Sequence, residues 1–351
     1  MTLGLYFLQY LICTASAMKI FLWLMILLVA GSGFNINQDG VYGAAYPYRP
    51  LDQSGGQSSL SPVIGFMQSH RIEQGETLLD IARKYGLGYN EISLKHPELD
   101  PWVPEEGLKI DIPTTWILPP TRHGEIVINL PEMRLYRFYR DIDMVRTYPV
   151  GIGRDGFETP PGDARVQKRV EDPSWTVPPS AREGFSRVVV PPGPDNPLGG
   201  YWIGLSRDSL GIHGTNFPWG VGRKVSRGCI RLYPEHIQQF FYDVEAGAKV
   251  EIIYEPVKLG LRGGDIFLEV HPDVYGKIAD MHSHVWDLLQ ASGLAPWVDL
   301  SEAGRVLEEK KGVPAVVTNS DMPGFIPGDE WCLMLSSTIQ IKGGCICSEN
   351  F

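Results

Sequence analysis

The chain has 351 residues, of which 43% are hydrophobic and 21% charged, a composition typical of globular proteins and a length sufficient for two or three domains. Its formal net charge is −10, and no stretch gathers basic residues into a stripe that could follow a phosphate backbone. We therefore expect no nucleic-acid partner. The 39 glycines and 28 prolines indicate many turns and favour a β-rich architecture.

The N-terminus carries two apolar runs, residues 3–17 and 20–30, with Lys19 between them. Met18-Lys19, the second run and Ala30-Gly31-Ser32 follow the order of a secretory signal, which is a positive charge, an apolar stretch and small residues at the cleavage site. We expect residues 1–33 to be the signal-peptide region, with Met18 as the true start of translation. The alternative is one uncleaved membrane anchor that spans both runs.

Residues 34–68 are rich in Gly, Ser, Gln, Tyr and Pro, and this composition predicts a linker. A strand is expected at residues 70–73. Thr77 can cap a helix, with Asp80 three residues on, and Leu78, Ile81, Ala82 and Tyr85 fall on one helical face before Gly86 ends it. A second helix at residues 89–95 and a strand at 108–112 complete a βααβ unit.

That unit, residues 69–114, resembles a LysM module, which binds the glycan of peptidoglycan or chitin. The resemblance lies in the opening strand, in Gly75-Glu76-Thr77-Leu78, Ile81-Ala82 and Tyr85-Gly86, and in residues 107–113, Gly-Leu-Lys-Ile-Asp-Ile-Pro. It implies a glycan ligand. The alternative is a small α+β spacer without a ligand.

From Gly124 the hydrophobic period changes to two, which predicts strands. Ile126, Ile128 and Leu130 alternate with Val127 and Asn129, and further strands are expected at residues 134–139, 144–150 and 249–254. Pro234 can open a helix whose apolar stripe packs on the core. The expected fold is mainly β, a sandwich or distorted barrel with the site in a groove between its edges and loops.

A thiol and an imidazole occur close together, in His213-Gly214-Thr215-Asn216 and in residues 226–232, Ser-Arg-Gly-Cys-Ile-Arg-Leu. A free thiol is largely protonated at neutral pH and becomes a strong nucleophile when an imidazole or a cation favours the thiolate. His213 could be that base for Cys229, and Arg227 and Arg231 could add positive charge.

The neighbours of Cys229 suit an acyl-transfer site. Gly228 leaves room for a substrate carbonyl, and backbone N–H groups around Cys229 could face the oxyanion. Arg231 would share a face with Cys229 in an extended segment and could bind a substrate carboxylate. Ser226 and Thr215 offer supporting hydrogen bonds.

The pattern HGTN…SRGCIRL resembles the catalytic motif of the L,D-transpeptidase (YkuD) family, and the resemblance covers residues 123–255, including the turn Thr159-Pro160-Pro161-Gly162. It implies that Cys229 is the nucleophile and His213 the general base or acid, with Gly214, Thr215, Ser226, Arg227, Gly228 and Arg231 around them. The third member of the catalytic group would be a backbone carbonyl, for which Gly214 is the nearest candidate. A Gram-negative, periplasmic and cell-wall-associated enzyme is implied.

The resemblance further implies a reaction without metal or cofactor. Cys229 would form a thioester with a peptidoglycan tetrapeptide stem, release D-alanine, and pass the acyl group to an amine of another stem or of an envelope lipoprotein. Glycan strands would be a second partner and carbapenems covalent inhibitors. The alternatives are an L,D-carboxypeptidase and an inert peptidoglycan-binding module.

Other functions of Cys229 remain open at this point. It could be half of a disulfide, since an exported chain would keep Cys332, Cys345 and Cys347 as well. It could also bind zinc with His213 and His236, although no paired-ligand motif supports this. A papain-like protease would need its cysteine before its histidine and partners that are missing here.

The C-terminal extension, residues 260–351, is expected to be a separate, partly helical tail with a helix at residues 274–291. His282 and His284 in it diverge on a helix and are expected to be exposed rather than to bind a metal. The tail resembles the C-terminal extension of Gram-negative periplasmic members of the family.

Overall fold

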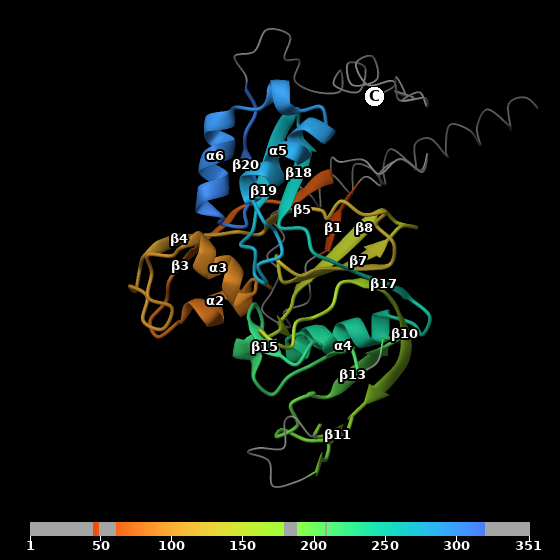
Figure 1. Cartoon of the computed structure of the whole chain (residues 1–351). Coiled ribbons are helices and arrows are strands. Elements are labelled where there is room, and N and C mark those ends of the chain that lie inside the picture. The colour runs from red at the N-terminus through yellow and green to blue at the C-terminus, as the bar shows by residue number, and fades with distance from the viewer. Residues whose placement is uncertain (1–44, 49–60, 179–187, 208, 320–351) are drawn as a thin grey trace, which may run out of the picture. The chain divides into compact units, whose positions relative to one another are not determined.

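The computed structural model describes residues 45–48, 61–178, 188–207 and 209–319 (Figure 1). Its largest feature is a nine-stranded sheet, which confirms the expectation of a mainly β fold. In order across the sheet the strands are β1 (Ala45–Pro47), β8 (Met144–Pro149), β7 (Arg134–Tyr139), β6 (Ile126–Asn129), β17 (Lys249–Ile253), β10 (Gly162–Glu171), β13 (Tyr201–Leu205), β14 (Gly211–His213) and β16 (Ile230–Arg231). Neighbours are antiparallel except for the pairs β6–β17 and β14–β16.

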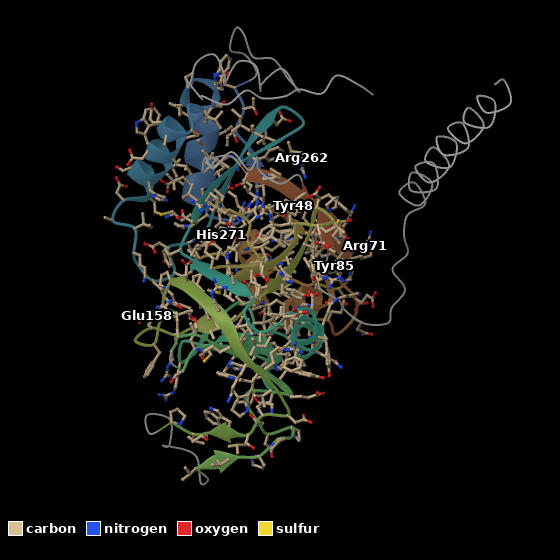
Figure 2. The ribbon with its side chains drawn as sticks, turned by 90° about the vertical axis from the view of Figure 1, so that its right-hand side faces the viewer. Tyr48, Arg71, Tyr85, Glu158, Arg262 and His271 are labelled. Carbon is tan, nitrogen blue, oxygen red and sulfur yellow. The ribbon has the colours of Figure 1, made fainter. Side chains whose placement is uncertain are left out.

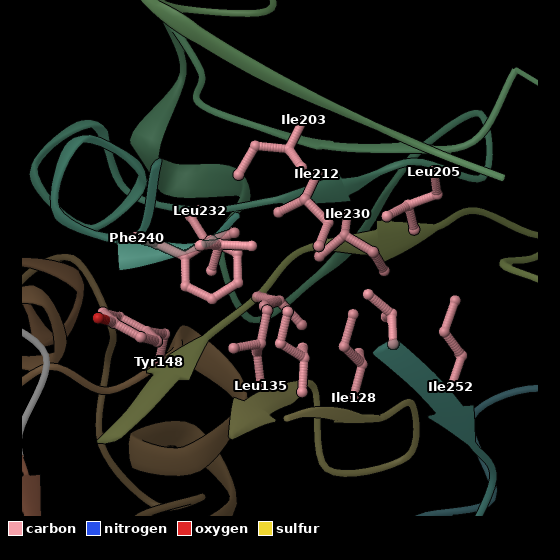
Figure 3. Close-up of a cluster of buried hydrophobic side chains, with 14 of the residues drawn as sticks. Ile128, Leu135, Tyr148, Ile203, Leu205, Ile212, Ile230, Leu232, Phe240 and Ile252 are labelled. Atoms are coloured by element: carbon pink, nitrogen blue, oxygen red, sulfur yellow. The ribbon is translucent and has the colours of Figure 1, made fainter. Parts of the chain in front are cut away.

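The sheet curls around one hydrophobic core. Figure 3 shows Ile203, Ile212 and Ile230, from β13, β14 and β16, facing Ile128, Leu135 and Ile252, from β6, β7 and β17. Helix α4 (Pro234–Asp243) begins at a proline, whose fixed φ suits the first turn of a helix. Its apolar residues recur on one face, and this face contributes Phe240 to the core. The strands β14 and β16, which carry the motif, are therefore anchored in this core.

Short elements surround the motif strands. Strands β9 (Ile152–Gly153) and β15 (Lys224–Ser226) pair in parallel, and β11 (Trp175–Thr176) pairs with β12 (Val189–Val190). A 3-10 turn, η2 (Pro218–Gly220), lies between β14 and β15. These elements supply the loops around the site.

The segment at residues 69–114 has the expected order of elements: β3 (Gln68–Arg71), α2 (Leu78–Lys84), α3 (Tyr89–Lys95) and β4 (Lys109–Ile112), with β3 antiparallel to β4. Thr77 and Asp80 form the expected capping box. Its hydrophobic residues do not form a core of their own. Leu78, Ile81 and Ile92 belong to one cluster with Val127 and Tyr136 of the main sheet, so this unit shares its core with the outer face of β6 and β7.

The predicted linker at residues 34–68 contains two strands, and to that extent the prediction was wrong. β1 extends the edge of the nine-stranded sheet beside β8. β2 (Ser61–Gly65) lies between β5 (Thr115–Ile117) and β18 (Val257–Arg262), because Val63 and Ile64 bury their side chains there. Neighbouring Ser, Gly and Pro residues obscured these short apolar segments.

The C-terminal extension is also not a separate tail. β18 forms a hairpin with β19 (Asp265–Val270), and the sheet order β20 (Ala315–Val316), β19, β18, β2, β5 joins both ends of the described chain. Helices α5 (Met281–Ala291) and α6 (Leu300–Glu309), with the turn η3 (Ala295–Trp297), pack on this hairpin (Figure 1).

Helix α5 is shorter than the predicted helix at residues 274–291. The Asp273 side chain accepts hydrogen bonds from the backbone N–H groups of Lys277 (2.9 Å) and Ile278 (2.7 Å). These bonds hold residues 273–278 in a turn, so the helix does not start there. The helix begins after Asp280, whose side chain accepts from the N–H of His282. His282 is exposed, as expected, and pairs with Glu308 at 3.2 Å.

The predicted signal peptide, residues 1–33, and Cys332, Cys345 and Cys347 lie outside the described residues. Among the helices that are described, none combines the length and the apolar character needed to cross a membrane.

Candidate active site

Parallel pairing of β14 and β16 brings the two motif segments together. Ile212 lies opposite Ile230 and His213 opposite Arg231, and the N–H of Leu232 donates to the carbonyl of His213 at 2.9 Å. Cys229 directly precedes β16. Its side chain and that of His213 line one cleft of about 800 Å³.

The His213 ring is held in one orientation. Its Nδ1 lies 2.6 Å from the carbonyl oxygen of Gly214, and the ring stacks on Trp202 with centroids 5.6 Å apart. A carbonyl oxygen only accepts hydrogen bonds, so Nδ1 carries the proton and Nε2 keeps a free lone pair. Burial, and then the charge of Arg231, lower the pKa of His213 to about 3. The imidazole is therefore neutral at neutral pH.

The thiol of Cys229 is protonated under the same conditions. Its Sγ donates to the carbonyl of Ser209 at 3.3 Å. Burial raises its pKa, and a hydrogen bond from the Gly211 backbone and the charge of Arg231 offset part of that increase. The resting site is thus a neutral pair of thiol and imidazole.

The predicted effect of Arg227 on the thiol has no counterpart in the geometry. The Arg227 side chain is exposed, and its guanidinium lies over the Phe157 ring, 4.8 Å from the centroid. The charge of Arg231, by contrast, acts on the sulfur and lowers the pKa of the thiol. The sequence alone did not show which of the two arginines acts on the thiol.

The turn that carries Cys229 is braced by Ser226. Its hydroxyl accepts from the N–H of Gly228 at 3.1 Å and donates to the carbonyl of Cys229 at 2.5 Å. Gly228 has a φ of +106°, a region that residues with a side chain rarely adopt. The glycine is therefore required by the backbone, in addition to leaving room for a substrate.

The cleft is positively charged although the chain as a whole is acidic. Among the described residues, its lining includes four basic side chains and no carboxylate: Arg154, Lys168, Arg227 and Arg231. Arg231 is half-buried and makes no ion pair with any described residue, and its Nε has no hydrogen-bond partner among them. Aromatic side chains complete the lining: Phe157, Trp175, Trp202 and Phe217.

The catalytic domain family of L,D-transpeptidases (YkuD) matches residues 123–252. The probable L,D-transpeptidase ErfK/SrfK of Escherichia coli is 35% identical over 264 residues, which are 71% of this chain and 85% of that protein. Its counterpart from Salmonella typhimurium is 34% identical over 76% of this chain and 90% of its own length. The chain belongs to the L,D-transpeptidase family. It is an enzyme of this class.

The chain is also similar to a relative over a smaller share of its length and to part of a solved structure. The probable L,D-transpeptidase YbiS of Escherichia coli is 37% identical over 60% of this chain and 72% of its own length. Among solved structures, the Ldtfm–avibactam carbamoyl enzyme aligns with 42% of this chain and 55% of its own, at 22% identity and a TM-score of 0.32.

Not every motif residue of this L,D-transpeptidase reaches the cleft. Ser226, Arg227 and Arg231 line it together with Cys229 and His213. Gly214 contributes its carbonyl to the imidazole, and Thr215 is buried, where its hydroxyl accepts from the N–H of Phe217 at 2.9 Å. Thr215 thus shapes the loop after the histidine.

Sequence reasoning missed Trp202 and Ser209. Trp202 covers the His213 ring, and a Cβ on Gly211 would come within 2.4 Å of the indole. Gly211, two residues before the position opposite Trp202, was a usable signal, since only Gly leaves space for a ring lying on the strand. Ser209 acts through its backbone carbonyl, for which no sequence signal exists.

The zinc site considered for Cys229 does not fit the described residues, and the cysteines considered as disulfide partners lie outside them. The Cys229 sulfur forms no disulfide with a described residue. His236 lies on α4 against Tyr148 and Tyr233, away from the cleft lining, so it does not converge with Cys229 and His213 on a metal.

A buried group of potential ligands does occur elsewhere, at Glu132, Glu269 and His271. The ammonium group of Lys258 occupies its centre, 3.0 Å from Glu132 and 2.9 Å from Glu269. The cation that these carboxylates bind is therefore the lysine, and the group connects β18 and β19 to the main sheet.

Proposed function

We propose that this L,D-transpeptidase acts on peptidoglycan stem peptides, with Cys229 as nucleophile and His213 as general base and acid. The donor is a tetrapeptide stem, and the bond that breaks joins its third residue, a diamino acid, to the terminal D-alanine. The product is a new bond from the diamino-acid carbonyl to an acceptor amine.

The neutral resting pair defines the order of proton transfers. As the thiol approaches the donor carbonyl, its proton moves to Nε2 of His213, and the sulfur adds to the carbonyl carbon. The tetrahedral intermediate collapses when His213 returns the proton to the departing D-alanine nitrogen, which leaves a thioester on Cys229. An acceptor amine then attacks, loses its proton to Nε2, and the regenerated thiol completes the cycle.

The Gly214 carbonyl supports the charged stage of this cycle. An imidazole with a folded pKa near 3 holds a proton poorly, so the imidazolium exists only while the oxyanion is present to balance it. The hydrogen bond at Nδ1 keeps Nε2 directed into the cleft throughout. Backbone N–H groups of the Cys229 turn would face the oxyanion.

The observation that carries the proposal is a thiol and an oriented neutral imidazole in one cleft, whose described lining holds four cations and no carboxylate. Stem peptides bear free carboxylates, so this lining favours their binding. Arg231, half-buried and without an ion-pair partner among the described residues, is the side chain that we assign to a donor carboxylate.

The βααβ unit at residues 69–114 is proposed to be a LysM module that binds a glycan strand. Because it shares its core with the main sheet, it would hold the glycan at a fixed position relative to Cys229, which raises the local concentration of stem peptides. Such a substrate implies export to the periplasm and association with the cell wall. An envelope lipoprotein is a possible acceptor class beside a second stem.

Covalent labelling tests the nucleophile. A carbapenem should add its full mass to Cys229 of the folded protein, detected by mass spectrometry of the intact protein and its peptides. Cys229→Ala should remain unlabelled. An unlabelled wild-type protein with native circular dichroism would favour the inert peptidoglycan-binding alternative.

Muropeptide analysis tests the reaction. A strain producing the wild-type protein should contain stem-to-stem or stem-to-lipoprotein links that are absent with Cys229→Ala. Shortened stems without new links would instead assign an L,D-carboxypeptidase, in which water replaces the acceptor amine.

A further inference from the structure

One tyrosine of the C-terminal extension is hydrogen-bonded to a loop of the catalytic domain. Residues 271–278, called the strap here, follow β19 and carry Tyr275. The Tyr275 hydroxyl donates to the carbonyl of Gly153 at 2.7 Å and accepts from the N–H of Thr159 at 3.3 Å. One side chain from outside the matched family domain therefore holds both ends of the loop at residues 153–159.

That loop is bonded to the turn that carries the nucleophile. Thr159 is fully buried, and its hydroxyl donates to the carbonyl of Gly228 at 2.9 Å while accepting from the N–H of Gly153 at 2.9 Å. The N–H of Arg154 donates to the carbonyl of Ser226 at 3.0 Å. Gly228 precedes Cys229, so the hydrogen bonds run from Tyr275 through Thr159 to the residue next to the sulfur.

The same loop forms part of the cleft wall. Arg154 and Phe157 line the cleft, whereas Glu158, labelled in Figure 2, lies on the exposed side of the loop. A shift of the loop would therefore change both the cleft and the position of the Cys229 turn.

The strap is held firmly enough to act as a support. The N–H of Tyr275 donates to the Tyr254 hydroxyl at 2.8 Å, and the two rings stack with centroids 6.0 Å apart. The ammonium group of Lys224, in β15, donates to the carbonyl of Val274 at 2.9 Å and pairs with Asp155 at 2.6 Å. The strap is thus bonded to β15 through the carbonyl of Val274 and to Tyr254 through the backbone of Tyr275.

A packing role alone would not require the hydroxyl. The Tyr275 ring is half-buried against the main core, and phenylalanine would provide the same apolar contact. The hydroxyl adds two hydrogen bonds to backbone groups six residues apart, which fixes a loop rather than fills a space.

We propose that Tyr275 is a positioning residue of the transpeptidase, which fixes the loop at residues 153–159 and, through Thr159, the turn that presents Cys229 to the donor carbonyl. The inference rests on the proposed function only in taking Cys229 as the nucleophile. It assigns a role in the reaction to the C-terminal extension.

The test compares Tyr275→Phe with wild type in the full chain. Stopped-flow acylation by a carbapenem gives a limiting rate and a half-saturation concentration. We expect the limiting rate to fall about 10-fold or more with little change in half-saturation, because a misplaced nucleophile impairs bond formation more than binding. Amide hydrogen exchange at Thr159 should become faster. Tyr242→Phe is the matched control: its hydroxyl donates to Glu171 at 3.0 Å, on the surface outside the cleft lining.

A second variant keeps the test decisive if Tyr275→Phe does not fold. Thr159→Val preserves shape but removes the hydrogen bond to Gly228, and it should slow acylation to a similar extent, without an additive effect in the double variant. A wild-type limiting rate in either folded variant would overturn the inference. Failure of the wild-type protein to acylate at Cys229 would instead overturn the proposed function.

Discussion

The Nδ1 atom of His213 lies 2.6 Å from the carbonyl oxygen of Gly214, the next residue in the chain. A backbone carbonyl cannot take a proton from the ring and carries no full charge, so it orients the imidazole and raises its pKa less than a carboxylate would. Together with burial, this leaves a base that is neutral across the physiological pH range.

The first prediction concerns the pH dependence of acylation. Because the pKa of His213 is lowered to about 3, the imidazole stays neutral well below pH 6.5, and carbapenem acylation should show no loss centred near that value. Rapid-mixing kinetics on folded protein between pH 5 and 8 measure this. A sigmoidal fall near pH 6.5 would contradict the neutral resting pair.

The second prediction concerns the thiol. Alkylation by iodoacetamide requires the thiolate, and the pKa of Cys229 is raised, so the alkylation rate should rise with a midpoint above the ordinary value of about 8.5. Arg231→Gln should move the midpoint higher, because the positive charge of Arg231 lowers the pKa of the thiol. A midpoint below 7 would show that the resting site holds a thiolate.

The third prediction separates backbone strain from catalysis at Gly228. Gly228→Ala forces a side chain into φ +106° and should destabilise the fold by about 1 kcal/mol while slowing acylation about 10-fold or more. Gly247→Ala is the control, since Gly247 has φ +92°, nothing within 4 Å of an added Cβ and no place in the cleft lining. It should lose similar stability in urea denaturation and acylate normally. Equal acylation rates in the two variants would contradict the assigned role of the turn.

Local signals were sufficient for several elements. The period-two pattern predicted β7 at its observed bounds, and the Thr77–Asp80 capping box with Gly86 predicted α2. The closeness of His213 and Cys229 in the sequence predicted that they would share a site. The structure brings them to one cleft through the parallel pairing of β14 and β16.

Contacts between segments distant in the sequence could not be predicted from such local patterns. Strand β6 is buried on both faces, with Ile126 and Ile128 in the main core and Val127 in the cluster shared with α2 and α3. The alternation of its side chains therefore does not separate a buried face from a solvent-exposed one. Nothing local in Ser61–Gly65 indicates that it pairs with strands from residues 115–117 and 257–262. The contacts of Tyr275 are likewise made with residues distant in the sequence, and no sequence motif indicates them.

The fourth prediction tests the contact of the βααβ unit with the main sheet. Arg134, fully buried on β7, binds Glu91 of α3 through two nitrogen–oxygen contacts of 3.0 and 2.5 Å, and Trp116 donates to the same carboxylate at 2.8 Å. Glu91→Gln leaves a buried guanidinium without its counter-charge and should destabilise the protein by about 3–5 kcal/mol. Chemical denaturation measures this, and the double variant Glu91→Leu/Arg134→Met should lose less than the sum of the single losses. A loss below about 1 kcal/mol for Glu91→Gln would indicate that the unit is only loosely attached.

The last prediction concerns acid stability and a histidine outside the cleft. His236 is fully buried between Tyr148 and Tyr233, and neither ring nitrogen has a hydrogen-bond partner among the described residues. Burial lowers its pKa to about 4, so the unfolded chain binds the proton more readily than the folded one.

Because the pKa of His236 is lower in the folded than in the unfolded chain, acid favours unfolding. The contribution of neutral His236 is complete above pH 6.5 and is lost as the pH falls from 6.5 towards 4. His236→Phe should therefore reduce the loss of stability between pH 7.5 and pH 5 by up to about 2 kcal/mol, and comparing two pH values cancels any constant packing cost. The exposed His282, changed to Gln, should leave the pH dependence unchanged. Urea denaturation at both pH values provides the measurement, and parallel curves for His236→Phe and wild type would mean that His236 is not the acid-sensitive group.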